Sequence, residues 1–239
     1  MNPDGNSPAD RPQVDGGRRR LVAAAGALVA GLPAATPLRG AVADANPAEA
    51  IEVVLLTHAG GAHLGAYLRA LAASPAVGGV RVADPDGAVF EEARGVLGTK
   101  VLSLERDVGT ALAAGRPRMA LVSMEAVRAP AAIRAALERG CHVLAEKPAC
   151  TSVAEFAPLV DLADARGLSI ALALANRLNP EVVEARARIA AGAIGRPLGV
   201  EMHLVQDRAR LERKEYRESW FADRARAGGG HLAWLGIHW

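Results

Sequence analysis

The chain has 239 residues, of which 51% are hydrophobic, 23% charged and only 3% aromatic. A chain this apolar can bury enough surface to fold, which excludes a fully disordered protein. Its length suits one or two domains. The formal net charge of +2 gives no electrostatic footprint for nucleic acid, and no Cys-x-x-Cys pair or His/Cys cluster suggests a structural metal site.

Residues 1–45 have the organisation of an export signal. Three arginines, Arg18–Arg20, precede an uncharged stretch over Leu21–Leu38, and small residues follow at 41–45. A basic segment, a short apolar segment and a small-residue cleavage site predict a signal peptide, here of the twin-arginine type. The alternative is a membrane anchor, which Pro33 and the many Ala and Gly residues disfavour. We therefore expect a periplasmic or other extracytoplasmic protein with no stable membrane span after cleavage.

From residue 51 to residue 174, short apolar runs alternate with segments of helical spacing. The predicted strands are residues 51–57, 80–83, 100–104, 119–124, 142–145 and 169–174. The predicted helices are residues 63–73, 89–97, 107–114, 130–139 and 152–166, the last opened by a Ser152–Glu155 capping box. Strands and helices in this alternation predict a doubly wound parallel sheet, with the ligand crevice beyond the carboxyl ends of the strands.

The pattern changes after residue 176. Asn179 and Pro180 are typical of the N-cap and first position of a helix, and the helix is expected to end near Gly192. Residues 198–205 have a strand pattern, and an apolar stretch closes the chain. We expect a dinucleotide-binding domain over residues 46–176 and the start of a second domain over residues 177–239.

Two cysteines, Cys141 and Cys150, flank the segment that contains the predicted fifth strand. An extended segment between them holds their Cα atoms beyond the roughly 7 Å limit for a disulfide. We expect two free thiols, buried rather than reactive.

The first strand-to-helix turn, Thr57–His63, is the candidate phosphate-binding turn. A G-x-G-x-x-G fingerprint would place backbone amides against a pyrophosphate at the helix N-terminus. Here Thr57, Ala59 and Ala62 occupy its glycine places, and the glycines stand at 60 and 61. Ala59, Gly60 and Gly61 are therefore the candidate cofactor-binding residues of the turn.

Asp84 ends the predicted second strand at roughly the 20-residue spacing of the carboxylate that binds the adenosine ribose. An acid there favours NAD over NADP, because it would repel a 2′-phosphate. The alternative role is that of a turn former before Pro85.

The fifth strand leads into Glu146-Lys147-Pro148, and this triplet resembles the hallmark of the Gfo/Idh/MocA oxidoreductases. Further segments that resemble the family are residues 83–86, 176–180, 193–195 and 228–238. The resemblance extends over about residues 51–239. It implies a Rossmann domain followed by an α+β domain with an open antiparallel sheet. It also implies a nicotinamide cofactor and a small sugar or polyol substrate between the two domains.

By the same resemblance, Lys147 lies beside the nicotinamide and the reacting hydroxyl, where an ammonium stabilises a developing alkoxide or relays its proton. Glu146 holds that lysine or the cofactor ribose, Arg177 belongs to the cofactor site, and His238 takes the hydroxyl proton. The alternatives are a solvated loop lysine at 147 and a packed helix histidine at 238.

The chain departs from the family pattern at three places. Trp234 stands where the family has an aspartate, four residues before the histidine and on the same face of the predicted helix, with His231 as a candidate substitute. Residues 124–129 replace the usual Thr-Pro-Asn-x-x-His. The third departure is the glycine fingerprint itself.

Three functions remain open from these residues. The first is an exported NAD-dependent oxidoreductase that carries its cofactor out of the cytoplasm. The second is NAD-dependent glycoside cleavage by oxidation and elimination. The third is a non-catalytic sugar-binding or interaction module. Because the second domain has one predicted strand, we expect a fragment of a longer product, and homo-oligomers are expected of the full-length form.

Overall fold

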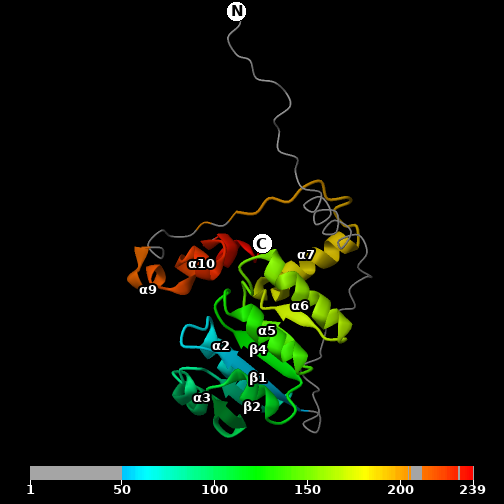
Figure 1. Ribbon diagram of the computed structural model, residues 1–239. Coiled ribbons are helices and arrows are strands. Elements are labelled where there is room, and N and C mark those ends of the chain that lie inside the picture. Colours follow the sequence, from blue (N-terminus) through cyan, green and yellow to red (C-terminus); the bar gives the residue numbers. More distant parts are fainter. Residues whose placement is uncertain (1–49, 204, 206–211, 231, 239) are drawn as a thin grey trace, which may run out of the picture. The chain divides into compact units, whose positions relative to one another are not determined.

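The structure is a computed structural model, and it describes residues 50–203, 205, 212–230 and 232–238 (Figure 1). By its internal contacts the chain divides into residues 1–39 and residues 40–239, and every described residue belongs to the second unit. The predicted export signal, residues 1–45, and the candidate His231 lie outside the described residues.

Six parallel strands form one sheet in the order β3-β2-β1-β4-β5-β6. The strands are β1 Ile51–Thr57, β2 Val77–Ala83, β3 Val101–Glu105, β4 Met119–Ser123, β5 His142–Ala145 and β6 Ile170–Leu172. This is the strand order of a doubly wound dinucleotide-binding fold, so the predicted Rossmann-type sheet is confirmed. The strand order reverses between β1 and β4, and the ligand crevice of such a fold lies at that point.

Alternate residues of the central strands pack on opposite faces of the sheet. Val54 and Leu56 of β1 face a core built with α4, α5 and α6, while Val53 and Leu55 face a second core built with α2 and α3 (Figure 1). All four side chains are fully buried. A continuous apolar run is the expected sequence of a strand that is covered on both faces.

The helices follow the predicted spacing. The helices of the first domain are α2 Leu64–Ala73, α3 Phe90–Leu97, α4 Val108–Ala113, α5 Ala129–Glu138 and α6 Val153–Ala165. Asp107 caps α4 by accepting a hydrogen bond from the Thr110 amide, and the Ser152–Glu155 capping box opens α6. Both caps satisfy amides that a helix N-terminus leaves without partners.

Helix α7 begins at Pro180 with Asn179 as its N-cap, as predicted, and runs to Ala190; the Asn179 side chain makes no capping hydrogen bond. One prediction past residue 176 is wrong. The strand predicted at 198–205 is absent among its described residues, because no described segment pairs with it and a lone strand leaves its backbone groups unsatisfied. Its apolar side chains Leu198, Val200, Met202 and Val205 are exposed.

The remaining described elements are short. They are α9 Lys214–Arg217, α10 Arg224–Ala227, three 3-10 turns at Gly98–Lys100, Ala175–Leu178 and Trp220–Ala222, and a π-helix at Leu232–Gly236. Within the described residues, no helix combines the length and apolar character needed to cross a bilayer. Cys141 and Cys150 are both free thiols, as predicted, and burial raises the pKa of each.

Candidate functional site

The carboxyl ends of β1, β4 and β5 meet at one edge of the sheet, and the loops that follow them carry most of the predicted site residues. Ala59, Gly60 and Gly61 follow β1, and Glu146 and Lys147 follow β5. Parallel strands deliver their carboxyl ends to the same edge, so residues distant in sequence are brought together there.

The turn after β1 approaches the backbone of β4 closely at Gly61. A β-carbon on Gly61 would lie 2.5 Å from Thr57 Oγ1 and 2.6 Å from the Ser123 carbonyl oxygen. Thr57 Oγ1 donates to that same carbonyl at 3.0 Å, and Ser123 Oγ donates to the Ala62 carbonyl at 2.9 Å. Gly61 therefore performs the close-packing task that the fingerprint assigns to a glycine, although the spacing differs.

The start of α2 retains donors for an anion. The amides of Gly60 and Gly61 are used within the turn, by His58 Nδ1 and by the His58 carbonyl. The amides of Ala62 and His63 have no hydrogen-bond acceptor in the described part of the chain. Because helix N-termini favour negative charge, these amides fit the pyrophosphate of a dinucleotide.

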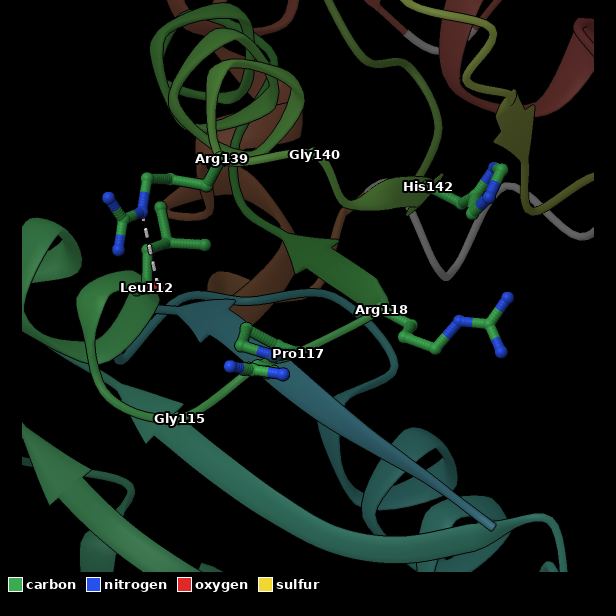
Figure 2. Close-up of a pocket in the computed structure, with 8 residues that line it drawn as sticks. Leu112, Gly115, Pro117, Arg118, Arg139, Gly140 and His142 are labelled. Atoms are coloured by element: carbon green, nitrogen blue, oxygen red, sulfur yellow. Dashed lines mark hydrogen bonds between the residues drawn. The ribbon is translucent and has the colours of Figure 1, made fainter. Parts of the chain in front are cut away.

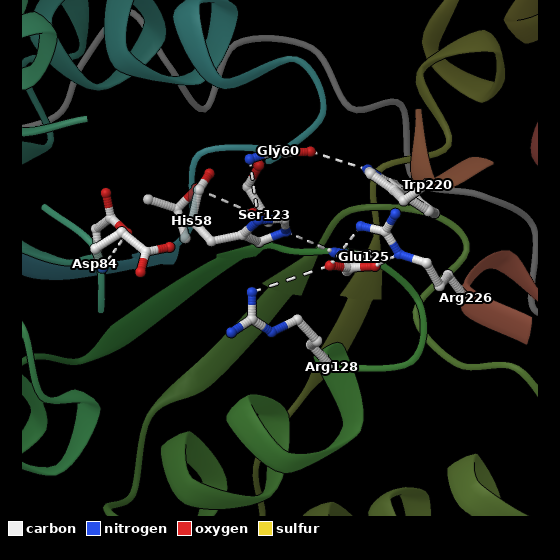
Figure 3. A network of polar contacts seen from close by, with 10 residues as sticks. His58, Gly60, Asp84, Ser123, Glu125, Arg128, Trp220 and Arg226 are labelled. Carbon is white, nitrogen blue, oxygen red and sulfur yellow. Dashed lines mark hydrogen bonds and ion pairs between the residues drawn. The ribbon is translucent and has the colours of Figure 1, made fainter. Parts of the chain in front are cut away.

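His58 connects this turn to the loop after β4 (Figure 3). Its two ring nitrogens face the amides of Gly60 at 3.0 Å and Glu125 at 3.1 Å. Neutral imidazole offers one acceptor nitrogen, so one of these two amides donates to it, and protonation of His58 would remove that hydrogen bond. Burial, followed by the charge of Arg128, lowers the pKa of His58.

An ion pair between buried Glu125 and partly exposed Arg226 lies beside His58, and the sequence patterns did not indicate it. Arg226 binds the Glu125 carboxylate with both ends of its guanidinium, at 2.6 and 3.1 Å. Burial opposes ionisation of Glu125, but the hydrogen bonds and charge of Arg226 lower its pKa overall. Arg226 belongs to α10, so the pair ties the C-terminal segment to the loop after β4.

Asp84 ends β2 and is fully buried. Its two oxygens accept hydrogen bonds from the amides of Asp86 at 3.1 Å and Val89 at 2.9 Å. These contacts are those of the turn former that the sequence left as the alternative. Each carboxylate oxygen still has a second lone pair, so the ribose contact stays a prediction.

Replacing Asp84 by Ala separates the two roles. We expect Asp84→Ala to cost about 1–3 kcal/mol for each buried amide left unpaired. If Asp84 also binds the ribose, the ratio of the Kd values for NADPH and NADH falls toward one. Asp86→Ala is the matched control, because it removes the same charge at an exposed position. Fluorescence titration and urea denaturation give the two readouts, and an unchanged cofactor preference would leave only the turn role.

Glu146 is buried and its carboxylate is fully engaged. Oε1 accepts the Lys147 amide at 2.9 Å, while Oε2 contacts His63 Nδ1 at 3.1 Å and accepts the Tyr67 hydroxyl. Burial works to raise the pKa of Glu146, but the hydrogen bonds from His63 and Tyr67 outweigh it and lower that pKa. Burial and the contact with Glu146 raise the pKa of Tyr67.

Lys147 is also buried, with 2% of its surface exposed, so it is not a solvated loop lysine. Its Nζ donates to the Trp234 carbonyl at 3.0 Å and lies 3.5 Å from the centre of the Trp234 ring. A cation over an indole face gains about 0.5–2 kcal/mol. Trp234, which stands where the family has an aspartate, therefore binds the lysine through its ring and its backbone.

An aromatic cluster covers this edge of the sheet. Trp220 packs edge-on against Trp234 at 5.3 Å, and Phe221 stacks on Trp234 at 4.8 Å. The Trp220 indole donates to the Gly60 carbonyl at 2.9 Å. The C-terminal segment thus contacts both the turn after β1 and the lysine after β5.

His238 follows the π-helix, so the predicted α-helical register with Trp234 is wrong. A π-turn is wider than an α-turn, and such turns are frequent at functional sites. The His238 Nδ1 is buried and has no hydrogen-bond partner in the part of the chain that the structure describes. Burial, followed by the charge of Lys147, lowers the pKa of His238.

Arg177, the last predicted cofactor residue, lies in the 3-10 turn after β6 and is exposed. The structure brings Gly60, Gly61, Glu146, Lys147 and His238 toward one edge of the sheet. Three further residues of that edge were not predicted as site residues: His63, Tyr67 and Glu125.

A basic hollow lies at the opposite edge, where β4 and β5 begin (Figure 2). Its volume is about 390 Å³, and its lining includes Arg116, Arg118, Arg139 and His142. Arg139 Nε donates to the Leu112 carbonyl at 3.4 Å, whereas the Arg118 side chain points away from it (Figure 2). The arginines do not converge on one point, and this hollow is remote from the predicted site.

Two family models match the chain. Residues 59–173 match the model described as an oxidoreductase family with an NAD-binding Rossmann fold. Residues 182–239 match the model of the GFO/IDH/MocA C-terminal domain. The two matches together span most of the chain.

One curated relative is an uncharacterized oxidoreductase of Schizosaccharomyces pombe. It is 33% identical over 106 residues, which are 44% of this chain and 27% of that protein. The chain therefore spans well under two thirds of the length of the relative that it matches.

Several solved structures share the fold. An NAD-binding oxidoreductase from Klebsiella pneumoniae superposes with a TM-score of 0.64 at 21% identity, covering 80% of this chain and 51% of that one. Levoglucosan dehydrogenase in complex with NADH and L-sorbose gives a TM-score of 0.65 at 21% identity, covering 79% and 52%. Scyllo-inositol dehydrogenase from Lactobacillus casei gives 0.54 at 18% identity, covering 61% and 42%.

Proposed function

Because the chain belongs to the GFO/IDH/MocA oxidoreductase family, we propose that it transfers hydride between a sugar or polyol hydroxyl and a tightly bound NAD. The observation that carries the proposal is the buried Lys147 ammonium, which Trp234 holds at the carboxyl edge of the sheet beside the turn that fits a pyrophosphate; His238 lies four residues after Trp234. An ammonium and a neutral imidazole at one place are the groups that a hydroxyl needs when it loses its proton.

The residues that would hold the cofactor come from three loops. The amides of Ala62 and His63 would bind the pyrophosphate. Asp84 would bind the adenosine ribose, and Glu146 would bind the second ribose or hold Lys147. Arg177 is assigned to the same site by the family resemblance. NAD, when bound, would accept the hydride.

The chain's own residues handle the proton. Lys147 stabilises the alkoxide as the hydroxyl loses its proton, because its ammonium is held in a buried, low-dielectric place. His238 accepts that proton. It can do so because its lowered pKa keeps the ring neutral at physiological pH. Trp234 excludes water from Lys147 instead of supplying a carboxylate.

The substrate class rests on similarity of fold and on the family. The similar levoglucosan and scyllo-inositol dehydrogenases are named for cyclic polyhydroxy compounds. Trp234 at the aspartate position is the one observation that favours a non-catalytic sugar-binding module.

Native mass spectrometry of the purified chain tests the proposal. We expect a co-purifying dinucleotide, or stabilisation by added NAD that follows RT ln(1 + [L]/Kd). A chain that carries no cofactor and whose Tm does not move with NAD would support the binding module. Glycoside turnover without net NADH would support cleavage by oxidation and elimination.

The proposed base has a defined pH dependence. A base must be deprotonated to act, and the pKa of His238 is lowered from the usual histidine value of 6.5. Activity is therefore expected to persist below pH 6.5 and to fall only as the pH drops through the lowered pKa. The measurement is the pH profile of kcat/KM for wild type and His238→Asn. An acid limb that His238→Asn leaves in place belongs to another group.

We also propose export by the twin-arginine route, which rests on the composition of residues 1–45. A protein exported in folded form would carry its cofactor with it. Cell fractionation checks this, and retention of the chain in the cytoplasm would contradict it.

A further inference from the structure

His63 has a backbone conformation that is uncommon for residues other than glycine. Its φ is +58°, the one positive value among the non-glycine residues that the structure describes. This left-handed region disfavours side chains with a β-carbon, and glycine or asparagine adopts it more easily. His63 also makes no side-chain cap for α2. Something other than the start of the helix therefore accounts for a histidine here, as for many residues with such backbone strain.

The His63 side chain has two partners. Its Nδ1 lies 3.1 Å from Glu146 Oε2, and its ring lies parallel to the Trp234 ring at 5.9 Å with an interplanar angle of 12°. The His63 side chain is 54% exposed, whereas the Glu146 side chain is 1% exposed. His63 thus contacts a buried carboxylate and a buried indole from the solvent side.

Both partners fix Lys147. Glu146 Oε1 accepts the Lys147 backbone amide at 2.9 Å. Trp234 holds the ammonium through its carbonyl oxygen and its ring face. His63 is the side chain that these two supports have in common, and it comes from the turn predicted to bind the cofactor.

We propose that His63 is a positioning residue that fixes the Lys147 ammonium through Glu146 and the Trp234 ring. Only its consequence for turnover rests on the proposed function; the placement of the lysine is measurable without turnover. An ammonium that shifts by about 1 Å loses much of its effect on a reacting oxygen.

The lysine content makes the test direct. The chain has three lysines, Lys100, Lys147 and Lys214, so a full-length sample labelled with 13Cε-lysine gives three ε-CH₂ signals. The Trp234 ring current moves the Lys147 signal upfield, because Nζ lies over the ring face. The Lys147→Arg variant lacks that signal, so it assigns the signal to Lys147. The Trp234→Leu variant gives the chemical shift of the Lys147 signal in the absence of the ring current.

His63→Gly is the main variant, since it removes both contacts and relieves the backbone conformation. The Lys147 signal is expected to move at least halfway to its position in Trp234→Leu, while the Lys100 signal stays. His63→Asn keeps the left-handed preference and an amide near the place of Nδ1, and it should retain part of the upfield shift. A Lys147 signal unchanged in folded His63→Gly overturns the proposal.

His63→Ala repeats the measurement with the backbone strain retained, in case the glycine variant folds poorly. An unchanged Lys147 signal there also overturns the proposal.

Turnover separates this proposal from the proposed function. In an active enzyme saturated with NAD, His63→Gly should lower kcat about tenfold or more and be partly rescued by His63→Asn. A wild-type chain that binds no NAD but shows the expected lysine shifts contradicts the proposed function and supports the placement. Full turnover in His63→Gly contradicts the positioning role even where the signal moves.

Discussion

Lys147→Ala is expected to lower kcat by a factor on the order of 10²–10³, the loss measured when one preorganised donor to a developing oxyanion is removed. The dinucleotide should remain bound, because the turn after β1 and the end of β2 do not depend on the lysine. The ammonium is held in place before substrate arrives, by the Trp234 carbonyl and ring, so its full effect is available to the reacting oxygen. Steady-state kinetics and a cofactor titration give the two readouts.

Two variants control this experiment. Lys100→Ala removes a lysine whose Nζ donates to the carbonyls of Leu71 and Ser74, remote from the site, and it should leave kcat unchanged. Lys147→Arg keeps the charge but not the ability to release a proton, so it separates electrostatic stabilisation from proton transfer. Near-normal turnover of Lys147→Ala would remove the lysine from the mechanism.

The sheet was predictable because its signals are local. A strand covered on both faces requires a continuous apolar run, as in Ile51–Thr57, and a capping box requires residues three apart, as in Ser152 and Glu155. The strand predicted at 198–205 shows the limit of such signals. Alternating apolar residues make a strand possible, but the hydrogen bonds come from a neighbour that no local pattern specifies.

The candidate site was predictable only where a motif carries it. Glu146 and Lys147 stand in a triplet that resembles a family hallmark, and Gly61 stands in a Gly-rich turn. The pair of Glu125 and Arg226 joins residues 101 positions apart, and the indole of Trp220 meets a carbonyl 160 positions away. Contacts across such distances depend on the fold, so sequence periodicity does not reveal them.

Both the fold and the candidate site require a residue without a β-carbon at position 61. Gly61→Ala places a β-carbon 2.6 Å from the Ser123 carbonyl oxygen and 2.5 Å from Thr57 Oγ1. The carbonyl belongs to buried strand β4 and accepts the Thr57 hydroxyl, so neither atom moves without loss of packing or of that hydrogen bond. Overpacking of this kind costs about 1–3 kcal/mol, and we expect the upper end of that range.

The same substitution should weaken NAD binding, because the turn can relieve the clash only by moving away from β4 and carrying the start of α2 with it. Gly95→Ala is the matched control. Gly95 lies inside α3 with no atom within 4 Å of its added β-carbon, so the change should stabilise the chain by about 0.5–1 kcal/mol. Urea midpoints at constant m report the stabilities, and titration with NADH reports the site. If Gly61→Ala matched Gly95→Ala in both, the close approach of the turn to β4 would not be what holds the phosphate-binding turn in place.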